Sequence, residues 1–173
     1  MLIIFTGNGK GKTTAALGQA IRALGQGKRV LMIQFIKGGW KTGEEKFFKR
    51  FKIKGVRFKL IKAGRGFVKI LGDKLPFEEH KKAAQKALAL AKKSVKSKKW
   101  DLIILDEINV AVSLKLIKVG NVLKILKSAP PDIILTGRGA PQSFIKLANL
   151  VTEMKEIKHP FKKGGLAKKG IEY

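Results

Sequence analysis

Short runs of consecutive hydrophobic residues alternate along this chain with stretches in which hydrophobic positions recur every three or four residues. The continuous runs lie at Leu2–Phe5, Arg29–Phe35, Leu102–Leu105 and Asp132–Thr136. Between helical segments, such runs are typical of strands buried on both faces of a parallel sheet. The segment Val56–Ile61 instead alternates hydrophobic and basic residues, which favours a strand near the edge of the sheet.

Helical periods follow most of these runs. They lie at Ala15–Leu24, Glu44–Phe51, Phe77–Val95, Ile108–Leu116, Val119–Leu126 and Ser143–Leu147. Pro76, with Glu78 and Glu79 soon after it, is a favourable start for the longest of these helices. Strands that alternate with helices predict a mostly parallel, doubly wound α/β sheet, and residues 1–173 are expected to form a single domain.

The first hydrophobic run leads through a glycine-rich turn into a helix, which is the context of a phosphate-binding P-loop. The turn consists of Gly7, Asn8, Gly9, Lys10, Gly11, Lys12, Thr13 and Thr14. Glycines let backbone N–H groups surround an anion, and the helix N-terminus adds further donors. Lys12 would add charge on the phosphates, and the Thr13 hydroxyl would bind Mg²⁺. The strict motif has a further glycine where this chain has Thr6, so chance glycines at a strand–turn–helix junction are the alternative.

The stretch Trp100–Glu107 is a hydrophobic strand that ends in two carboxylates, Asp106 and Glu107. Downstream of a P-loop, this arrangement resembles a Walker B element, whose aspartate holds Mg²⁺. Glu107 is then either a metal ligand or a base that activates water. Because parallel strands end on one edge, the segments that follow the other strands are expected to complete the same site. These segments are Ile36–Glu44, Gly64–Lys69 and Thr136–Pro141.

Composition excludes several kinds of site. The chain has no cysteine, and therefore neither disulfides nor thiolate metal ligands. Its histidines are His80 and His159, which disfavours a multi-histidine zinc site. His80 falls on the hydrophobic stripe of its predicted helix, where packing is the expected role. The sequence contains no recognisable signal peptide or membrane span, which predicts a cytoplasmic protein.

The net charge of +26 has two interpretations. It favours a nucleic-acid partner, as in a P-loop ATPase coupled to nucleic acid, or it reflects a lysine-rich surface around a polyanionic ligand. The lysines are spread along the chain and aromatic residues make up only 8% of it, which disfavours a stacking platform for single strands. A nucleotide-binding protein without turnover is a third alternative.

Seven short motifs occur along the chain in the order found in one protein family. They are FTGNGKGKTTAALG at 5–18, QFIKGGWKTGE at 34–44, Gly66-Phe67, LDEIN at 105–109, LTGRGAP at 135–141, LVTEM at 150–154, and KHPF with the terminal GIEY. Across essentially the whole chain, the sequence resembles the P-loop ATP:corrinoid adenosyltransferases, which make adenosylcobalamin.

The resemblance implies transfer of the 5′-deoxyadenosyl group from ATP to Co(I) of a reduced corrinoid, with tripolyphosphate as the leaving group. It also implies that ATP lies in the P-loop with reversed polarity, so that C5′ faces the nucleophile. ATP would be held by residues 7–14 and Arg138, and Mg²⁺ or Mn²⁺ by Thr13, Asp106 and Glu107. Since Co(I) has no proton to lose, Glu107 is then expected to bind metal, and Lys12 to neutralise the triphosphate.

The resemblance also implies that bulky apolar side chains displace the lower ligand of a Co(II) corrinoid. Phe67 matches one of them, with core packing as its alternative role, whereas the tryptophan found two residues later in the family is Lys69 here. Trp40 matches a loop expected to line the corrinoid site. A flavoprotein-type reductant and a homodimer are implied, without a membrane or nucleic-acid partner. Two departures are a start directly at the first strand, where some members have a preceding segment, and Asn149 in place of aspartate.

Overall fold

The computed structural model describes residues 1–39, 41–50, 55, 57–70, 72–128, 131–160, 164 and 166–171. At its centre is a six-stranded sheet in the order β3-β2-β4-β5-β1-β6. The strands are β1 (Leu2–Thr6), β2 (Val30–Gln34), β3 (Phe58–Lys62), β4 (Leu102–Asp106), β5 (Asp132–Thr136) and β6 (Leu150–Glu153). Every neighbouring pair runs parallel, so the predicted parallel α/β sheet is confirmed.

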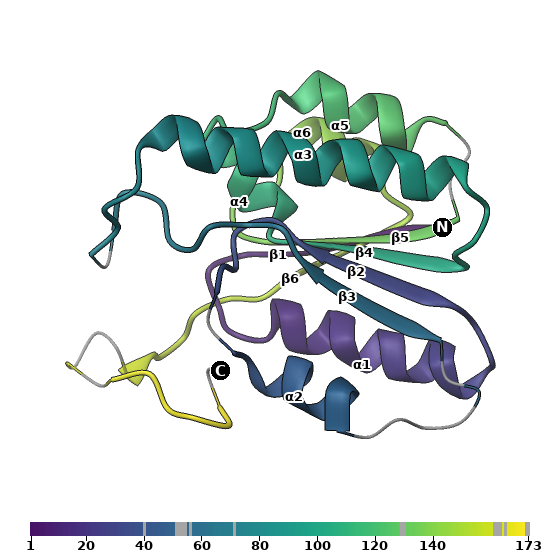
Figure 1. Cartoon of the computed structure of the whole chain (residues 1–173), viewed down its shortest axis with the longest axis horizontal. Coiled ribbons are helices and arrows are strands. Elements are labelled where there is room, and N and C mark those ends of the chain that lie inside the picture. The colour runs from purple at the N-terminus through teal and green to yellow at the C-terminus, as the bar shows by residue number, and fades with distance from the viewer. Residues whose placement is uncertain are drawn as a thin grey trace.

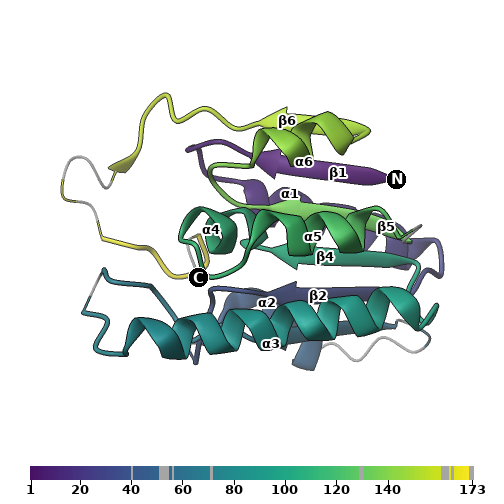
Figure 2. The same ribbon diagram turned by 90° about the horizontal axis from the view of Figure 1, so that it is seen from above.

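Helices cover both faces of this sheet (Figure 1). One face carries α1 (Lys12–Gly25) and α2 (Gly43–Arg50). The opposite face carries α3 (Phe77–Lys96), α4 (Ile108–Ser113), α5 (Val119–Leu126) and α6 (Gln142–Leu147). Figure 2 shows α3 and α5 side by side above the central strands. None of the helices in the described part of the chain combines the length and the apolar character needed to cross a membrane.

The core lies on both sides of the sheet, which explains the uninterrupted hydrophobic runs. Every residue of β2 and of β4 is buried. On the side of α1, Met32 and Ile104 pack against Ala16 and Ala20, whose small side chains let the helix approach the sheet. On the other side, a larger cluster joins the alternate strand residues to α3, α4, α5 and α6. The predicted edge strand is also confirmed, because β3 ends the sheet and is only partly buried.

The predicted element ends mostly agree with the structure to within one or two residues. Pro76 is the cap of α3 and not its first residue, and its carbonyl accepts the Glu79 N–H at 2.9 Å. The helix predicted to end at Leu116 ends at Ser113, because Lys115 has a left-handed backbone with a φ of 59°. Two predicted end residues, Phe51 and Val56, lie outside the described residues.

Candidate active site at the carboxyl edge of the sheet

The glycine-rich turn joins β1 to α1 and packs against the segment that follows β6. Gly7 has a φ of 93°, and a Cβ atom there would lie 2.8 Å from the backbone nitrogen of Met154. The Gly9 N–H donates to the Met154 carbonyl at 2.6 Å. Two backbones therefore touch at the turn, which only glycine permits.

Thr6 occupies the position at which the strict P-loop motif has a glycine, and the structure gives it a specific role. Its hydroxyl donates to the Gly137 carbonyl at 3.0 Å and accepts the Ala140 N–H at 3.2 Å. These bonds join the start of the P-loop to the loop after β5. The departure from the motif thus links two segments that the sequence predicts to share one site.

Lys12 lies within the turn at the start of α1. Only 8% of its surface is exposed, and its ammonium donates to the Gly9 carbonyl. Burial lowers the pKa of Lys12, an effect that the nearby charge of Glu107 opposes and that of Arg138 reinforces. A buried ammonium whose hydrogen-bond partner is a carbonyl gains from an incoming anion, since the anion would offset the cost of its desolvation.

Asp106, at the end of β4, is completely buried and is the centre of a polar cluster. Its Oδ1 accepts hydrogen bonds from the Thr13 hydroxyl at 2.8 Å and the Thr136 hydroxyl at 2.7 Å. Its Oδ2 accepts one from the Gln34 amide at 3.1 Å, and the Lys37 ammonium lies 3.6 Å away. Because the Thr13 hydroxyl donates its hydrogen bond to Asp106, the lone pairs of the Thr13 oxygen remain available to a cation.

Lys37 and Glu44 form the outer part of this cluster. The Lys37 ammonium donates to Glu44 at 3.1 Å, and the Gln34 amide donates to the same oxygen at 3.2 Å. Burial alone would lower the pKa of Lys37, but the charges of Asp106 and Glu44 raise it above its ordinary value. Gln34 and Glu44 are site residues that sequence reasoning did not single out. The available signal was Gln34, a polar residue inside the hydrophobic run Arg29–Phe35.

Glu107 follows Asp106 directly, with a left-handed φ of 60°. Its backbone N–H donates to the Thr136 hydroxyl at 2.9 Å. Burial, together with the charge of Asp106, raises the pKa of Glu107 to about 7, although Lys12, Lys37 and Arg138 oppose this. Within the described residues, its carboxylate makes no hydrogen bond or ion pair. Two adjacent carboxylates at a buried edge would be stabilised by a bound cation.

The residues fit a magnesium site that substrate phosphates complete. Within the described part of the chain, no group of three or more His, Cys, Asp and Glu side chains forms a protein-only metal cage. Mg²⁺ commonly binds one or two carboxylates, waters and substrate phosphates instead. The Thr13 oxygen and the Glu107 carboxylate could supply donors to such a site. Both oxygens of Asp106 are engaged with the protein, so Asp106 is suited to orient Thr13.

The loop after β5 brings Arg138 to the same edge. Gly137 has a φ of 124°, and a Cβ atom there would lie 3.1 Å from Oε2 of Glu107. The side chain of Asn109 donates to the Gly137 carbonyl at 3.2 Å. Arg138 itself is exposed, and its charge acts on both Lys12 and Glu107. The predicted clustering of this loop with the P-loop and the end of β4 is therefore confirmed.

Phe67 lies on a neighbouring loop whose base is fixed to the end of β2. The Gly66 N–H donates to the Ile36 carbonyl at 2.9 Å. Phe67 is 42% exposed, whereas the next residue, Val68, is buried. This exposure excludes the alternative that Phe67 is an ordinary core residue. Val68 anchors the loop, and Phe67 keeps a substantial part of its surface exposed.

Asp73 and His80 hold the far end of this loop against α3. The His80 Nε2 atom lies 3.1 Å from Oδ1 of Asp73, and both side chains are buried. Asp73 also accepts the backbone N–H groups of Lys69 at 2.8 Å and Leu75 at 3.1 Å. The Lys69 ammonium lies 4.8 Å from the centre of the Phe77 ring. His80 is thus packed as predicted, and the Lys69 ammonium stacks on the ring of Phe77 at the start of α3.

We expect Asp73→Asn to lower the urea midpoint of unfolding at pH 7. The hydrogen bonds from Lys69, Leu75 and His80 hold the pKa of Asp73 below its ordinary value, despite partial desolvation. The ionised carboxylate therefore stabilises the fold above its unfolded pKa of about 3.9, and this contribution is lost as the pH falls through the lower folded pKa. The difference between the two proteins should shrink below about pH 4. Equal midpoints at pH 7, or an equal loss in the exposed control Glu78→Gln, would contradict this role.

Several predicted residues have other surroundings or are not described. Asn8 and Thr14 are exposed, and the Lys10 ammonium donates to the Ile171 carbonyl at 2.6 Å. Asn149 lies at the opposite end of β1, where its side chain accepts the Leu2 N–H at 2.7 Å, which explains a polar residue there. Trp40 lies outside the described residues.

Comparison with known proteins identifies the family. Residues 1–173 match the family model described as ATP:corrinoid adenosyltransferase BtuR/CobO/CobP. The chain is 36% identical over 175 residues to the corrinoid adenosyltransferase of Escherichia coli (strain K12), covering 100% of this chain and 85% of that protein. It is 37% identical over 175 residues to the corrinoid adenosyltransferase of Pseudomonas aeruginosa, covering 100% and 83%.

A solved structure with a similar fold is that of the RadB recombinase, with a TM-score of 0.50 and 16% identity. The match covers 92% of this chain and 76% of that one, and at this identity it supports the fold alone. The family model and the full-length relatives agree with the motifs gathered at the carboxyl edge. The chain therefore belongs to the family of ATP:corrinoid adenosyltransferases.

Proposed function

We propose that the carboxyl edge of this sheet binds ATP and a reduced corrinoid, and transfers the 5′-deoxyadenosyl group of ATP to Co(I). Family membership supplies the overall reaction, adenosyl transfer from ATP to a corrinoid. The observation that carries the assignment of the site is the buried Asp106 cluster. It joins the P-loop hydroxyl of Thr13 to the ends of β2 and β5, and thereby unites the predicted segments.

The proposed reaction breaks a carbon–oxygen bond and transfers no proton. The electron pair of Co(I) forms a bond to C5′ while the C5′–O5′ bond breaks, and tripolyphosphate leaves with O5′ and the bonding electrons. A general base is therefore unnecessary. The protein contributes the alignment of C5′ with cobalt and the neutralisation of charge on the departing triphosphate.

Lys12 and Arg138 are the cations assigned to the triphosphate. Lys12 is buried beneath the turn, where the low dielectric strengthens its attraction for phosphate. Arg138 is exposed at the same edge and is electrostatically coupled to Lys12. The Gly9 N–H is occupied by Met154, so we assign phosphate contacts to the other amides of the loop and to the start of α1.

Mg²⁺ or Mn²⁺ is included in the proposal, with Thr13 and Glu107 as its protein ligands. When bound, the metal ion supplies positive charge that neutralises the leaving triphosphate. Asp106 orients the Thr13 oxygen by accepting its hydrogen bond, with 2.8 Å between the two oxygens. It is assigned to the metal site through Thr13 or through water. Glu107 is assigned as a ligand because the reaction needs no base and its carboxylate has no hydrogen-bond partner among the described residues.

Phe67 is proposed to act on the corrinoid, and an external donor to supply electrons. An exposed phenylalanine on a loop fixed at both ends suits contact with a flat macrocycle and exclusion of its lower ligand. Lys69 does not replace the missing tryptophan in this arrangement, since its ammonium lies over Phe77. We include a flavoprotein-type reductant for Co(II) and a homodimer in the proposal, on the basis of family resemblance.

We expect Phe67→Ala to spare the reaction with pre-formed Co(I) and to slow the reaction that starts from Co(II) by about tenfold or more. In this proposal Phe67 displaces the lower ligand of the corrinoid, which must happen before Co(II) is reduced. It has no part in the transfer from ATP to Co(I). The measurement is the anaerobic rate from each cobalt state. Ile70→Ala is the matched control, since Ile70 is 57% exposed on the same loop. Equal losses from both cobalt states would refute the assignment.

One anaerobic assay tests the proposed function. The protein is mixed with ATP, Mg²⁺ and chemically reduced corrinoid, and both the corrinoid spectrum and the phosphate product are followed. Tripolyphosphate together with a cobalt–carbon product is the expected result. Release of orthophosphate without a change in the corrinoid would instead indicate an ATPase, and binding without turnover would indicate a carrier.

A further inference from the structure

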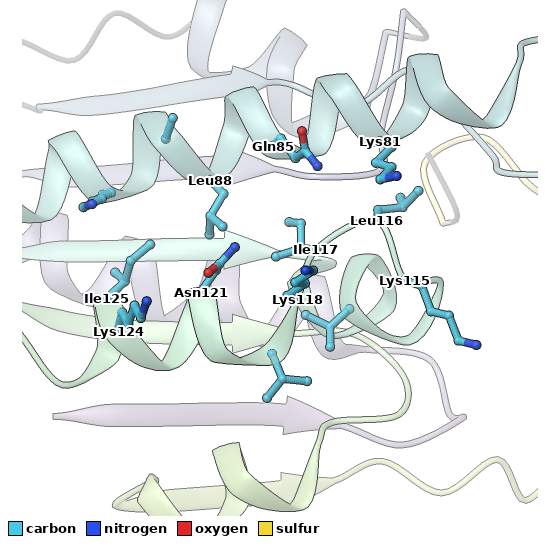
Figure 3. Close-up of a pocket in the computed structure, with 14 residues that line it drawn as sticks. Lys81, Gln85, Leu88, Lys115, Leu116, Ile117, Lys118, Asn121, Lys124 and Ile125 are labelled. Atoms are coloured by element: carbon cyan, nitrogen blue, oxygen red, sulfur yellow. The ribbon is translucent and has the colours of Figure 1, made fainter.

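A groove lies between α3 and α5, on the face of the sheet opposite to α1 (Figure 3). Its volume is about 980 Å³. Figure 3 shows Leu88 of α3 and Ile117 of the segment before α5 lying between the two helices. None of the residues assigned above to ATP, metal or corrinoid lines this groove. It is therefore a feature separate from the proposed active site.

The floor of the groove is hydrophobic. Its base is formed by Leu88, Leu116, Ile117 and Ile125, which belong to the core and are each 9% exposed or less. The accessible apolar surface above this base comes from the exposed Ala89, the half-buried Val119 and the aliphatic stems of the lining lysines. Along α3 the groove runs from Lys81 to Lys92, which are about 16 Å apart along the helix axis. This length matches about three turns of a partner helix. An amphipathic helix recognises such a groove through apolar residues spaced three, four and seven positions apart.

The rim of the groove is uniformly basic. Lys92, Lys115, Lys118 and Lys124 line it and form no ion pair within the described part of the chain. A fifth lysine, Lys81, is paired with Glu78 at 3.3 Å. No acidic and no aromatic side chain is found among the described residues that line the groove. Unpaired lysines on both walls of a hydrophobic groove are complementary to carboxylates that flank an apolar stripe.

We propose that this groove docks an acidic amphipathic helix of a partner protein, whose apolar stripe packs on Ala89, Val119 and the lysine stems and whose carboxylates pair with the rim lysines. This inference does not depend on the proposed function. A nucleic acid is a poorer occupant, because the floor is hydrophobic and no aromatic side chain lines the groove for base stacking. A second copy of the chain is also poorer. With 38 basic against 12 acidic residues, it would bring lysines against lysines.

The test uses a defined probe and a charge-matched control. The probe is a stapled helical peptide of about four turns with a leucine stripe flanked by glutamates. A scrambled peptide has the same composition and charge without the stripe. The rim variant carries Lys92→Glu, Lys118→Glu and Lys124→Glu. The control variant carries Lys93→Glu, Lys127→Glu and Lys146→Glu, which are exposed lysines outside the groove, so the net charge of the two variants is equal.

Binding is measured by fluorescence anisotropy at about 0.15 M salt, where long-range attraction to the basic surface is largely screened. We expect the ordered peptide to bind at least about tenfold more tightly than the scrambled one. The rim variant should lose about 10- to 100-fold in affinity, and the control variant about twofold or less. Ala89→Phe, which fills the groove without a change of charge, should also weaken binding. All variants should retain adenosyl transfer, which shows that they fold.

Three results would overturn the inference. Equal losses in the rim and control variants would reduce the binding to general attraction by a basic surface. Equal affinity for the ordered and scrambled peptides would remove the helical stripe from the argument. If single-stranded DNA of equal charge displaced the peptide from the wild type and lost more affinity than the peptide did in the rim variant, the groove would be a nucleic-acid surface.

Discussion

Lys12→Ala is expected to abolish adenosyl transfer, with kcat/KM lower by about 10³-fold while the protein stays folded. The wild-type ammonium is buried beneath the turn, where it donates to the Gly9 carbonyl, and a bound triphosphate would give it a direct anionic partner. The interaction then strengthens as negative charge collects on the leaving group, so its loss falls on the transition state. The measurement is the initial rate with pre-formed Co(I) at varied ATP, together with thermal unfolding of each protein.

The same loop provides the control for this prediction. Lys10 is exposed two positions earlier, and its ammonium contacts the Ile171 carbonyl. Lys10→Ala should therefore cost less than about tenfold in kcat/KM. Equal losses at the two positions would contradict the assignment of Lys12, because they would show that the loop responds to total charge and not to the buried ammonium.

Asp106→Ala is expected to be the most damaging single change to both stability and activity. It removes the acceptor of Thr13, Thr136 and Gln34 and leaves the Lys37 ammonium with Glu44 alone. Breaking a buried network of this kind costs about 3–5 kcal/mol in the free energy of unfolding. Adenosyl transfer should fall below detection, since Thr13 is no longer oriented. Urea denaturation and the Co(I) assay measure the two effects.

Two further variants separate folding from function at this position. Asp106→Asn keeps the size of the side chain and one acceptor oxygen, so it should recover part of the stability but little of the activity. Asp101→Ala, near the opposite end of β4, removes the half-buried ion pair with Arg29 at 2.8 Å, far from the proposed site, and should leave activity close to wild type. If Asp106→Asn were as active as the wild type, the negative charge of Asp106 would have no part in the site.

The overall fold could be predicted because burial on both faces leaves a direct trace in the sequence. The runs that became β2 and β4 contain almost no polar residue, and the helices between them repeat their hydrophobic positions at helical spacing. The strand order could not be predicted in this way. It depends on which strands become neighbours, such as β1 between β5 and β6, and a hydrophobic run does not specify its partner.

The candidate site was predictable where a residue type is tied to a local motif. The P-loop and Asp106 are examples, because each follows directly from a strand and its turn. The partners of Asp106 were not predictable, since Gln34 and Thr136 reach it only through the register of β2, β4 and β5. The Asp73–His80 pair was missed for a different reason. Its function is to close a loop, and a loop leaves no periodic pattern.

The structure shows the surroundings of two residues that depart from the family pattern, Asn149 and Lys69. Asn149 provides the acceptor for the Leu2 N–H at the start of β1, a task that an aspartate oxygen would perform equally well. Lys69 has a φ of 58°, and its backbone N–H is bound by Asp73. The side-chain hydrogen bond accounts for Asn149, whereas the backbone bond of Lys69 would be open to almost any residue and does not explain a lysine there.

The central claim is that carbon, and not phosphorus, is attacked, and the fate of the 5′ oxygen tests it most directly. ATP is labelled with ¹⁸O at the atom that bridges C5′ and the α-phosphorus, and it is allowed to react with Co(I) corrinoid in the presence of the protein. The masses of the products are then measured by mass spectrometry. Our account predicts that all of the label leaves with tripolyphosphate. Label retained on the nucleoside, or recovered in a nucleotide beside orthophosphate or pyrophosphate, would contradict it.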